Sequence, residues 1–74
     1  MMELNCHLVM SRQTLKGWKN ARPDGKPADI LRWIQVEIGV LSGWALEFPQ
    51  REAEIDPLIV QWAELAANMR AKMK

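Results

Sequence analysis

The chain has little of the residue types that most often carry chemistry in small proteins. It contains one cysteine, Cys6, and one histidine, His7, among 74 residues. A single cysteine excludes an intrachain disulfide and a cysteine-based metal cluster, and one additional histidine does not make a zinc site. We therefore predict no cofactor and no metal ion. The lack of disulfides is typical of a reducing cytoplasm, which is the compartment we expect.

Long apolar runs and catalytic motifs are also missing. No segment approaches the ~20 apolar residues of a membrane span, and the N-terminus lacks the apolar stretch of a signal peptide. No second histidine, suitably spaced carboxylate or phosphate-binding glycine loop accompanies Cys6 and His7. These two residues are expected to pack or to lie on the surface. We expect no membrane partner, no small-molecule substrate and no enzymatic activity.

What the chain does have is apolar side chains and an uneven distribution of charge. Hydrophobic residues make up 49% of the sequence and include four tryptophans, so one small domain with a thin core is expected. The net charge is +1, but segment 11–32 is basic, segment 33–64 is acidic and the last ten residues are basic again. A basic front and an acidic back suit a protein that presents one side to an anion.

The hydrophobic pattern predicts an all-α fold of about four helices. They are expected at 1–8, 11–20, 27–39 and 55–73, the last being a long C-terminal helix. Pro27 and Pro57 suit first helical positions, and Asp56 is a candidate cap for the last helix. Gly39 is a candidate stop for the third helix. Between them, Trp44, Leu46 and Phe48 alternate with other residues, so a short extended segment is expected near 43–48.

The segment from Ser11 to Asn20 is the most informative part of the chain. Ser11 is a candidate N-cap, and Leu15 and Trp18 lie one turn apart on an inward face. The opposite face presents Arg12 and Lys16 with their neighbours, as a helix that enters the major groove requires. Gly17 inside this helix either leaves it close to fraying or lets its backbone approach DNA or another helix.

The spacing resembles the helix-turn-helix unit of the lambda repressor and Cro class of phage regulators. In that unit apolar residues occupy the fourth, eighth, tenth, fifteenth and eighteenth places, and a small polar residue opens the second helix. Here those places hold Leu4, Leu8, Met10, Leu15 and Trp18, and Ser11 opens the expected second helix. The family usually has Ala at the fifth place and Gly at the ninth, where this chain has Asn5 and Val9. The segment also resembles recognition helices of the form SxxTLxxW in small prophage proteins.

The resemblance implies a small phage or prophage transcription regulator that acts in the cytoplasm of a bacterial host. It would be a helix-turn-helix domain that binds double-stranded operator DNA as a homodimer, with 1–41 as the DNA-binding core, 42–54 as an extended connector and 55–74 as a packing or dimerisation helix. Repressor, Cro-like switch and excision-type factor all fit. Base-reading residues would be Arg12, Gln13 and Lys16. Phosphate contacts would come from Ser11, Thr14, Lys19, Asn20, Arg22 and Lys26.

Several alternatives remain open at the level of the sequence. The charged face of 11–20 could be an ordinary solvated surface. The apolar seam of the C-terminal helix could join two subunits or pack within the chain, and its residues are Leu58, Trp62, Leu65 and Met69. The extended segment could pair across a dimer axis or lie on the core as an arm. The rival function is a small phage-type inhibitor of a host enzyme or regulator, acting through the acidic segment 47–56 and the Trp44/Phe48 surface.

Overall fold

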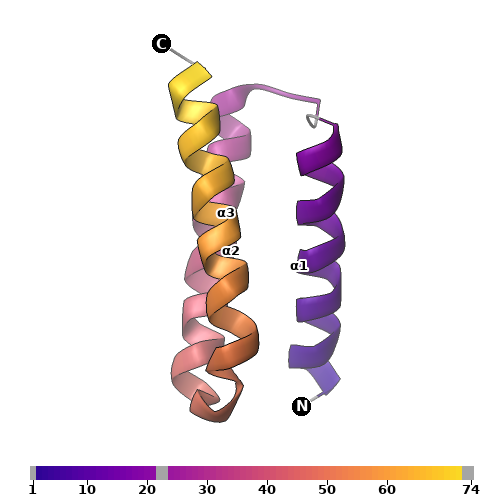
Figure 1. Cartoon of the computed structure of the whole chain (residues 1–74), viewed down its shortest axis with the longest axis vertical. Coiled ribbons are helices and arrows are strands. Elements are labelled where there is room, and N and C mark those ends of the chain that lie inside the picture. Colours follow the sequence, from indigo (N-terminus) through magenta and orange to yellow (C-terminus); the bar gives the residue numbers. More distant parts are fainter. Residues whose placement is uncertain (1, 22–23, 73–74) are drawn as a thin grey trace.

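The computed structural model describes residues 2–21 and 24–72. In this part of the chain, α1 (Met2–Asn20), α2 (Pro27–Glu47) and α3 (Glu52–Lys72) run up, down and up, and a 3₁₀ turn, η1 (Pro49–Arg51), joins α2 to α3. The bundle is elongated, with extents of 39 × 18 × 17 Å (Figure 1). Helices α2 and α3 pack closely, whereas α1 has fewer contacts with them. None of the helices described here is long and apolar enough to cross a membrane.

The all-α prediction is confirmed, but the prediction of four helices and a helix-turn-helix unit is not. The helices expected at 1–8 and 11–20 are one continuous helix, α1. No glycine or proline interrupts the chain between Leu8 and Ser11, and Val9 and Met10 continue the helix as exposed residues. Ser11 is therefore not an N-cap, because it lies in the middle of α1.

Helix α2 begins where expected and ends later than expected. Pro27 occupies the first turn and Asp29 lies near the N-terminus, where a carboxylate is favourable. Gly25 precedes the helix with a φ of +124°, which glycine adopts without strain. Gly39 does not stop the helix, because the inward stripe continues through Leu41 and Ala45.

The prediction of an extended segment near 43–48 was wrong, because residues 43–47 form the last turn of α2. Trp44 and Phe48 are four residues apart and stack at a centroid distance of 5.7 Å, so their spacing is helical. The helix stops at Phe48, whose extended φ of −125° suits a residue before Pro49. Helix α3 then begins at Glu52, earlier than the expected start, so Pro57 lies inside it.

Three tryptophans and one serine meet where the three helices face one another, although Trp33 remains partly exposed. Trp18, Trp33 and Trp62 come one from each helix, with ring centroids 4.9–5.3 Å apart. Trp62 is fully buried, and its indole N–H donates a hydrogen bond of 2.8 Å to the hydroxyl of Ser11, which is also buried. A small polar residue is needed at this position because a buried indole N–H requires an acceptor.

The Ser11–Trp62 bond joins α1 to α3, and a second polar contact joins α1 to α2. Nε2 of His7 lies 2.9 Å from Oε2 of Glu37, and the Glu37 side chain is buried. The ring of His7 also lies 6.5 Å from that of Trp44. Glu37 is thus a buried carboxylate that is satisfied by the single histidine of the chain.

Candidate nucleic-acid interface

The three helices gather cationic side chains at one end of the bundle. Helices α1 and α3 finish, and α2 starts, at the same end (Figure 1). In this half, which we call the cationic end, the basic residues are Arg12, Lys16, Lys19, Lys26, Arg32, Arg70 and Lys72, and the acidic residues are Asp24, Asp29 and Glu64. All of these residues are exposed. Separate basic stretches of the sequence therefore meet at one surface.

The opposite half carries the reverse charge. Its acidic residues are Glu3, Glu47, Glu52, Glu54 and Asp56, and its basic residue among the described part of the chain is Arg51. The up-down-up topology produces this separation, because the acidic end of α2 and the acidic start of α3 are neighbours. A bundle with such poles meets a polyanion preferentially with its cationic end.

Five of the seven residues of α1 that were predicted to contact DNA are exposed, and three of these lie on its outer side. Gln13, Lys16 and Asn20 are exposed and follow the spacing of three and four that puts residues on one helix face. Arg12 is also exposed, one residue before Gln13, and it is turned toward α3. Gln13, Lys16 and Asn20 share the outer face of α1, whereas Arg12 borders it on the side of α3, so Arg12 diverges from the other two predicted base-reading residues. We call these four donors together the α1 outer ridge.

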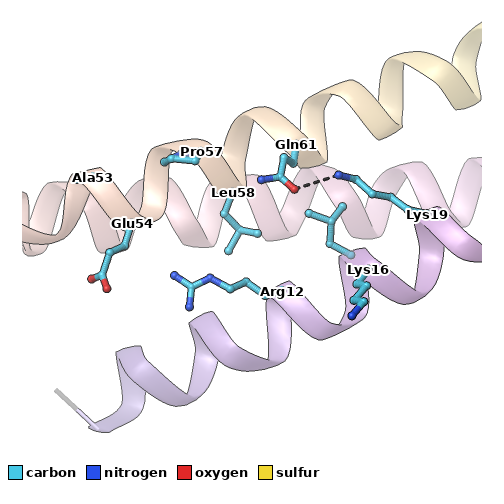
Figure 2. A pocket seen from close by; sticks show the side chains of 9 residues that line it. Arg12, Lys16, Lys19, Ala53, Glu54, Pro57, Leu58 and Gln61 are labelled. Carbon is cyan, nitrogen blue, oxygen red and sulfur yellow. Dashed lines mark hydrogen bonds between the residues drawn. The ribbon is translucent and has the colours of Figure 1, made fainter.

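A groove of about 580 Å³ runs beside this ridge, between α1 and α3. Figure 2 shows the guanidinium of Arg12 extending into the space between the helices on the side of Glu54, while the ammonium of Lys16 points away from α3. The amine of Lys19 donates a hydrogen bond of 3.0 Å to Oε1 of Gln61. The remaining lining residues are Leu15, Ala53, Pro57 and Leu58. Arg12 and Lys19 thus line the groove, whereas Lys16 faces outward.

At the end of the groove lined by Glu54, the charged side chains form hydrogen bonds within the chain. The guanidinium of Arg51 donates hydrogen bonds to the carboxylate of Glu54 and, at 2.7 Å, to Oδ1 of Asn5. The hydrogen bond from Arg51 lowers the pKa of Glu54, and the charges of Arg51 and Arg12 act in the same direction. The Glu54 carboxylate stays ionised and draws Arg12 toward α3.

Other residues predicted to contact phosphate lie elsewhere. The hydroxyl of Ser11 is buried and accepts the indole N–H of Trp62, so it is not available to a phosphate in this arrangement. Thr14 is half-buried on the side of α1 that faces α2, one heptad from His7. Lys26 is exposed at the cationic end, just before α2. Arg22 lies outside the described residues.

The predicted dimer seam of the last helix packs within the chain. Leu58 and Trp62 are 3% and 0% exposed, and Leu65 and Met69 are half-buried against the same core. The first two offer no surface to a second copy in this structure. Of the two alternatives for this seam, the structure has intrachain packing.

One surface was not singled out by the sequence. Met10, Trp33, Val36, Val40 and Leu46 are among the exposed large apolar residues, and all except Met10 belong to α2. The sequence does contain the pattern, because Trp33, Val36 and Val40 follow a helical spacing beside the stripe of Ile30, Ile34 and Leu41. It was missed because the helix was predicted to end at Gly39, before Val40 and Leu46.

The described residues contain no group of three or more histidine, cysteine, aspartate or glutamate side chains that could hold a metal ion. Comparison with protein-family models, with curated proteins and with solved structures gave no match.

Proposed function

We propose that this chain is a small DNA-binding regulator that contacts double-stranded DNA through the α1 outer ridge and the cationic end. The observation that carries the proposal is the convergence of cations from all three helices at one end of the bundle. Cations near helix C-termini also stabilise the helix dipole, which accounts for Lys19, Arg70 and Lys72. It does not account for Lys26, which directly precedes the N-terminus of α2, where positive charge is unfavourable, or for Arg32 in the second turn of α2.

The outer ridge supplies the chemistry for base contacts. A major groove accepts a single α-helix, and α1 lies beside the closely packed α2–α3 pair with fewer contacts than these two helices make with one another. Arginine favours guanine and glutamine favours adenine by two-point hydrogen bonding, so Arg12 and Gln13 are the proposed base-reading residues together with Lys16. Lys19, Asn20 and Lys26 are proposed to hold phosphates, which fixes the register without reading sequence.

A salt-dependent gel shift tests the proposal with matched variants. The first variant combines Arg12→Gln with Lys16→Gln on the ridge, and the control combines Arg32→Gln with Arg70→Gln, which removes the same charge from α2 and α3. If the ridge contacts DNA, the first variant should lower the slope of log K against log salt more than the control does, and by up to about 1.8 if both cations also neutralise a phosphate in the complex. Equal slopes would contradict a ridge contact, and no binding at low salt would contradict the proposal as a whole.

Base reading is tested separately with Gln13→Ala. This change alters no charge, so affinity for random duplex should remain the same. Affinity for a selected duplex should fall by about 1–3 kcal/mol if Gln13 makes a two-point contact with a base. A selected duplex is obtained by enriching random sequences on the unmodified protein. Equal losses on random and selected duplex would show that Gln13 does not read sequence.

A second candidate function is a protein-binding module, and the exposed apolar face of α2 favours it. The inhibitor surface expected from the sequence used Trp44 and Phe48, but both are packed against the core. The exposed residues Val36, Val40 and Leu46 would instead provide the contact area. This function predicts no salt-dependent binding to duplex DNA, so the same gel shift separates the two candidates.

A further inference from the structure

The outer face of α2, opposite its core stripe, is apolar and exposed. Val36 is 62% exposed, Val40 40% and Leu46 83%. Together they expose on the order of 300 Å², which is comparable to the largest apolar patch on a typical monomer, and such patches are often functional. We propose that this face is a homodimer interface in which α2 packs against α2 of a second copy, antiparallel.

Two glycines indicate that another helix approaches this face closely. Gly39 lies in the middle of α2 and Gly43 at the start of its last turn; both are exposed, and a Cβ added at either would meet nothing within 4 Å. Glycine in a helix interior lowers helix stability, and no neighbour inside the chain requires a small residue at either position. Glycines spaced by four residues let two helix backbones come together, so close approach of a second copy would account for both.

The charges on α2 select the antiparallel arrangement. Exposed Arg32 and Glu47 lie near opposite ends of the face, on either side of its glycines. A parallel pair would set Arg32 against Arg32 and Glu47 against Glu47, whereas an antiparallel pair sets each arginine opposite a glutamate. A twofold axis close to Val40 achieves this, and the same register sets Val36 opposite Gly43 of the second copy, where open space receives its side chain.

The available area sets the strength of this dimer. A standard stable interface buries about 800 Å² on each partner. The apolar side chains of this face expose on the order of 300 Å², which is less than half of that area. We therefore expect a weak, reversible dimer with a dissociation constant of about 10 µM. Notably, this interface does not use Leu58, Trp62, Leu65 or Met69.

The antiparallel arrangement has a consequence that rests on the proposed function. It places the two cationic ends at opposite ends of the dimer. Each lies about ten residues from the twofold axis along α2, so they are separated by roughly 30 Å at 1.5 Å per residue. This distance is close to one turn of DNA, ~34 Å, which is the spacing of half-sites read by two-fold symmetric dimers. The dimer itself does not depend on DNA.

Sedimentation equilibrium without DNA tests the interface with a matched pair of variants. Val36→Lys places a charge in the proposed interface, and Val60→Lys places the same charge on α3, where Val60 is 54% exposed. The unmodified chain and Val60→Lys should dimerise with the same constant, and Val36→Lys should dimerise at least about tenfold more weakly. Circular dichroism should show equal helix content for all three. A monomer at 200 µM (roughly twenty times the expected constant), or equal effects of both substitutions, would overturn the proposal.

The register is tested by charge reversal. Arg32→Glu alone and Glu47→Arg alone should each weaken the dimer, because each sets like charges against one another across the interface. The double variant should restore the original constant. If the double variant dimerises no better than the single ones, antiparallel pairing is overturned. Because DNA is absent from both experiments, their failure would leave the DNA-binding proposal standing, and its failure would leave the dimer standing.

Discussion

Replacing Ser11 tests the central contact of the fold, the hydrogen bond from the buried indole of Trp62. The donor and acceptor are 2.8 Å apart, and Trp62 is fully buried. Ser11→Ala leaves the indole N–H without a partner, which costs about 1–3 kcal/mol. Alanine recovers about 0.5 kcal/mol through its better helix propensity. We expect a net loss of about 1–2 kcal/mol from a total stability of about 4–11 kcal/mol for 74 residues.

The matched control is Ser42→Ala. Ser42 is also inside a helix, but it is exposed and its hydroxyl bonds only to the carbonyl of Ile38 in its own helix. Removing that hydroxyl should leave stability unchanged or raise it slightly. Urea unfolding followed by circular dichroism gives the free energy of unfolding of each variant. If Ser11→Ala is as stable as Ser42→Ala, the Ser11–Trp62 bond does not stabilise the core.

Ser11→Asp and Ser11→Gly separate this structure from a helix-turn-helix unit. If Ser11 capped a second helix, aspartate would cap equally well and glycine would lose only a few tenths of a kcal/mol. In the middle of a buried helix face, aspartate would bring a carboxylate into the core, and glycine would add a helix penalty of about 1 kcal/mol to the lost bond. We expect both variants to be less stable than Ser11→Ala. A stable Ser11→Asp variant would refute the continuous helix.

Two further substitutions probe α1. Gly17→Ala should raise the free energy of unfolding by about 1 kcal/mol in urea, because Gly17 is exposed and an added Cβ meets nothing within 4 Å; if stability rises while DNA affinity falls, the backbone at Gly17 approaches DNA. His7→Ala should lower stability by about 1–3 kcal/mol, since it leaves the buried Glu37 carboxylate without its partner, and the double variant with Glu37→Gln should recover part of that loss. No recovery would show that the pair is not coupled.

The apolar positions of the core could be read from the sequence, but the path of the backbone through them could not. Leu4, Leu8, Leu15 and Trp18 were expected to face inward, and the three leucines are buried while Trp18 is half-buried against them. The same spacing fits two short helices around a turn or one straight helix, provided that residue 11 also faces inward. Ser11 is polar, so its inward position was not evident without its partner Trp62, which is 51 residues away.

The prediction of an extended segment at residues 43–48 failed for a related reason. Trp44, Leu46 and Phe48 alternate as in a strand, but Leu41, Trp44 and Phe48 also follow the helical spacing of three and four. The helical reading wins because it buries Leu41 and Ala45 in line with the rest of α2, and a lone strand has no partner for its backbone. Glycine at 39 and 43 obscured this continuity, since it usually marks the end of a helix.

The basic and acidic stretches could be recognised in the sequence, but only the topology shows where they lie relative to one another. The sequence divides into basic, acidic and basic stretches, which by themselves are compatible with charges spread over the whole surface. The up-down-up order folds both basic stretches onto one half of the bundle and the acidic stretch onto the other, so Lys16 and Arg70 lie in the same half although they are far apart in sequence. A bundle in which α1 ran in the opposite direction would carry the same composition without this pole. The case for a polyanionic partner therefore rests on the order and direction of the helices. Comparing the Arg12/Lys16 double variant with the Arg32/Arg70 double variant measures how much of the attraction to DNA comes from α1 and how much from the cationic end as a whole.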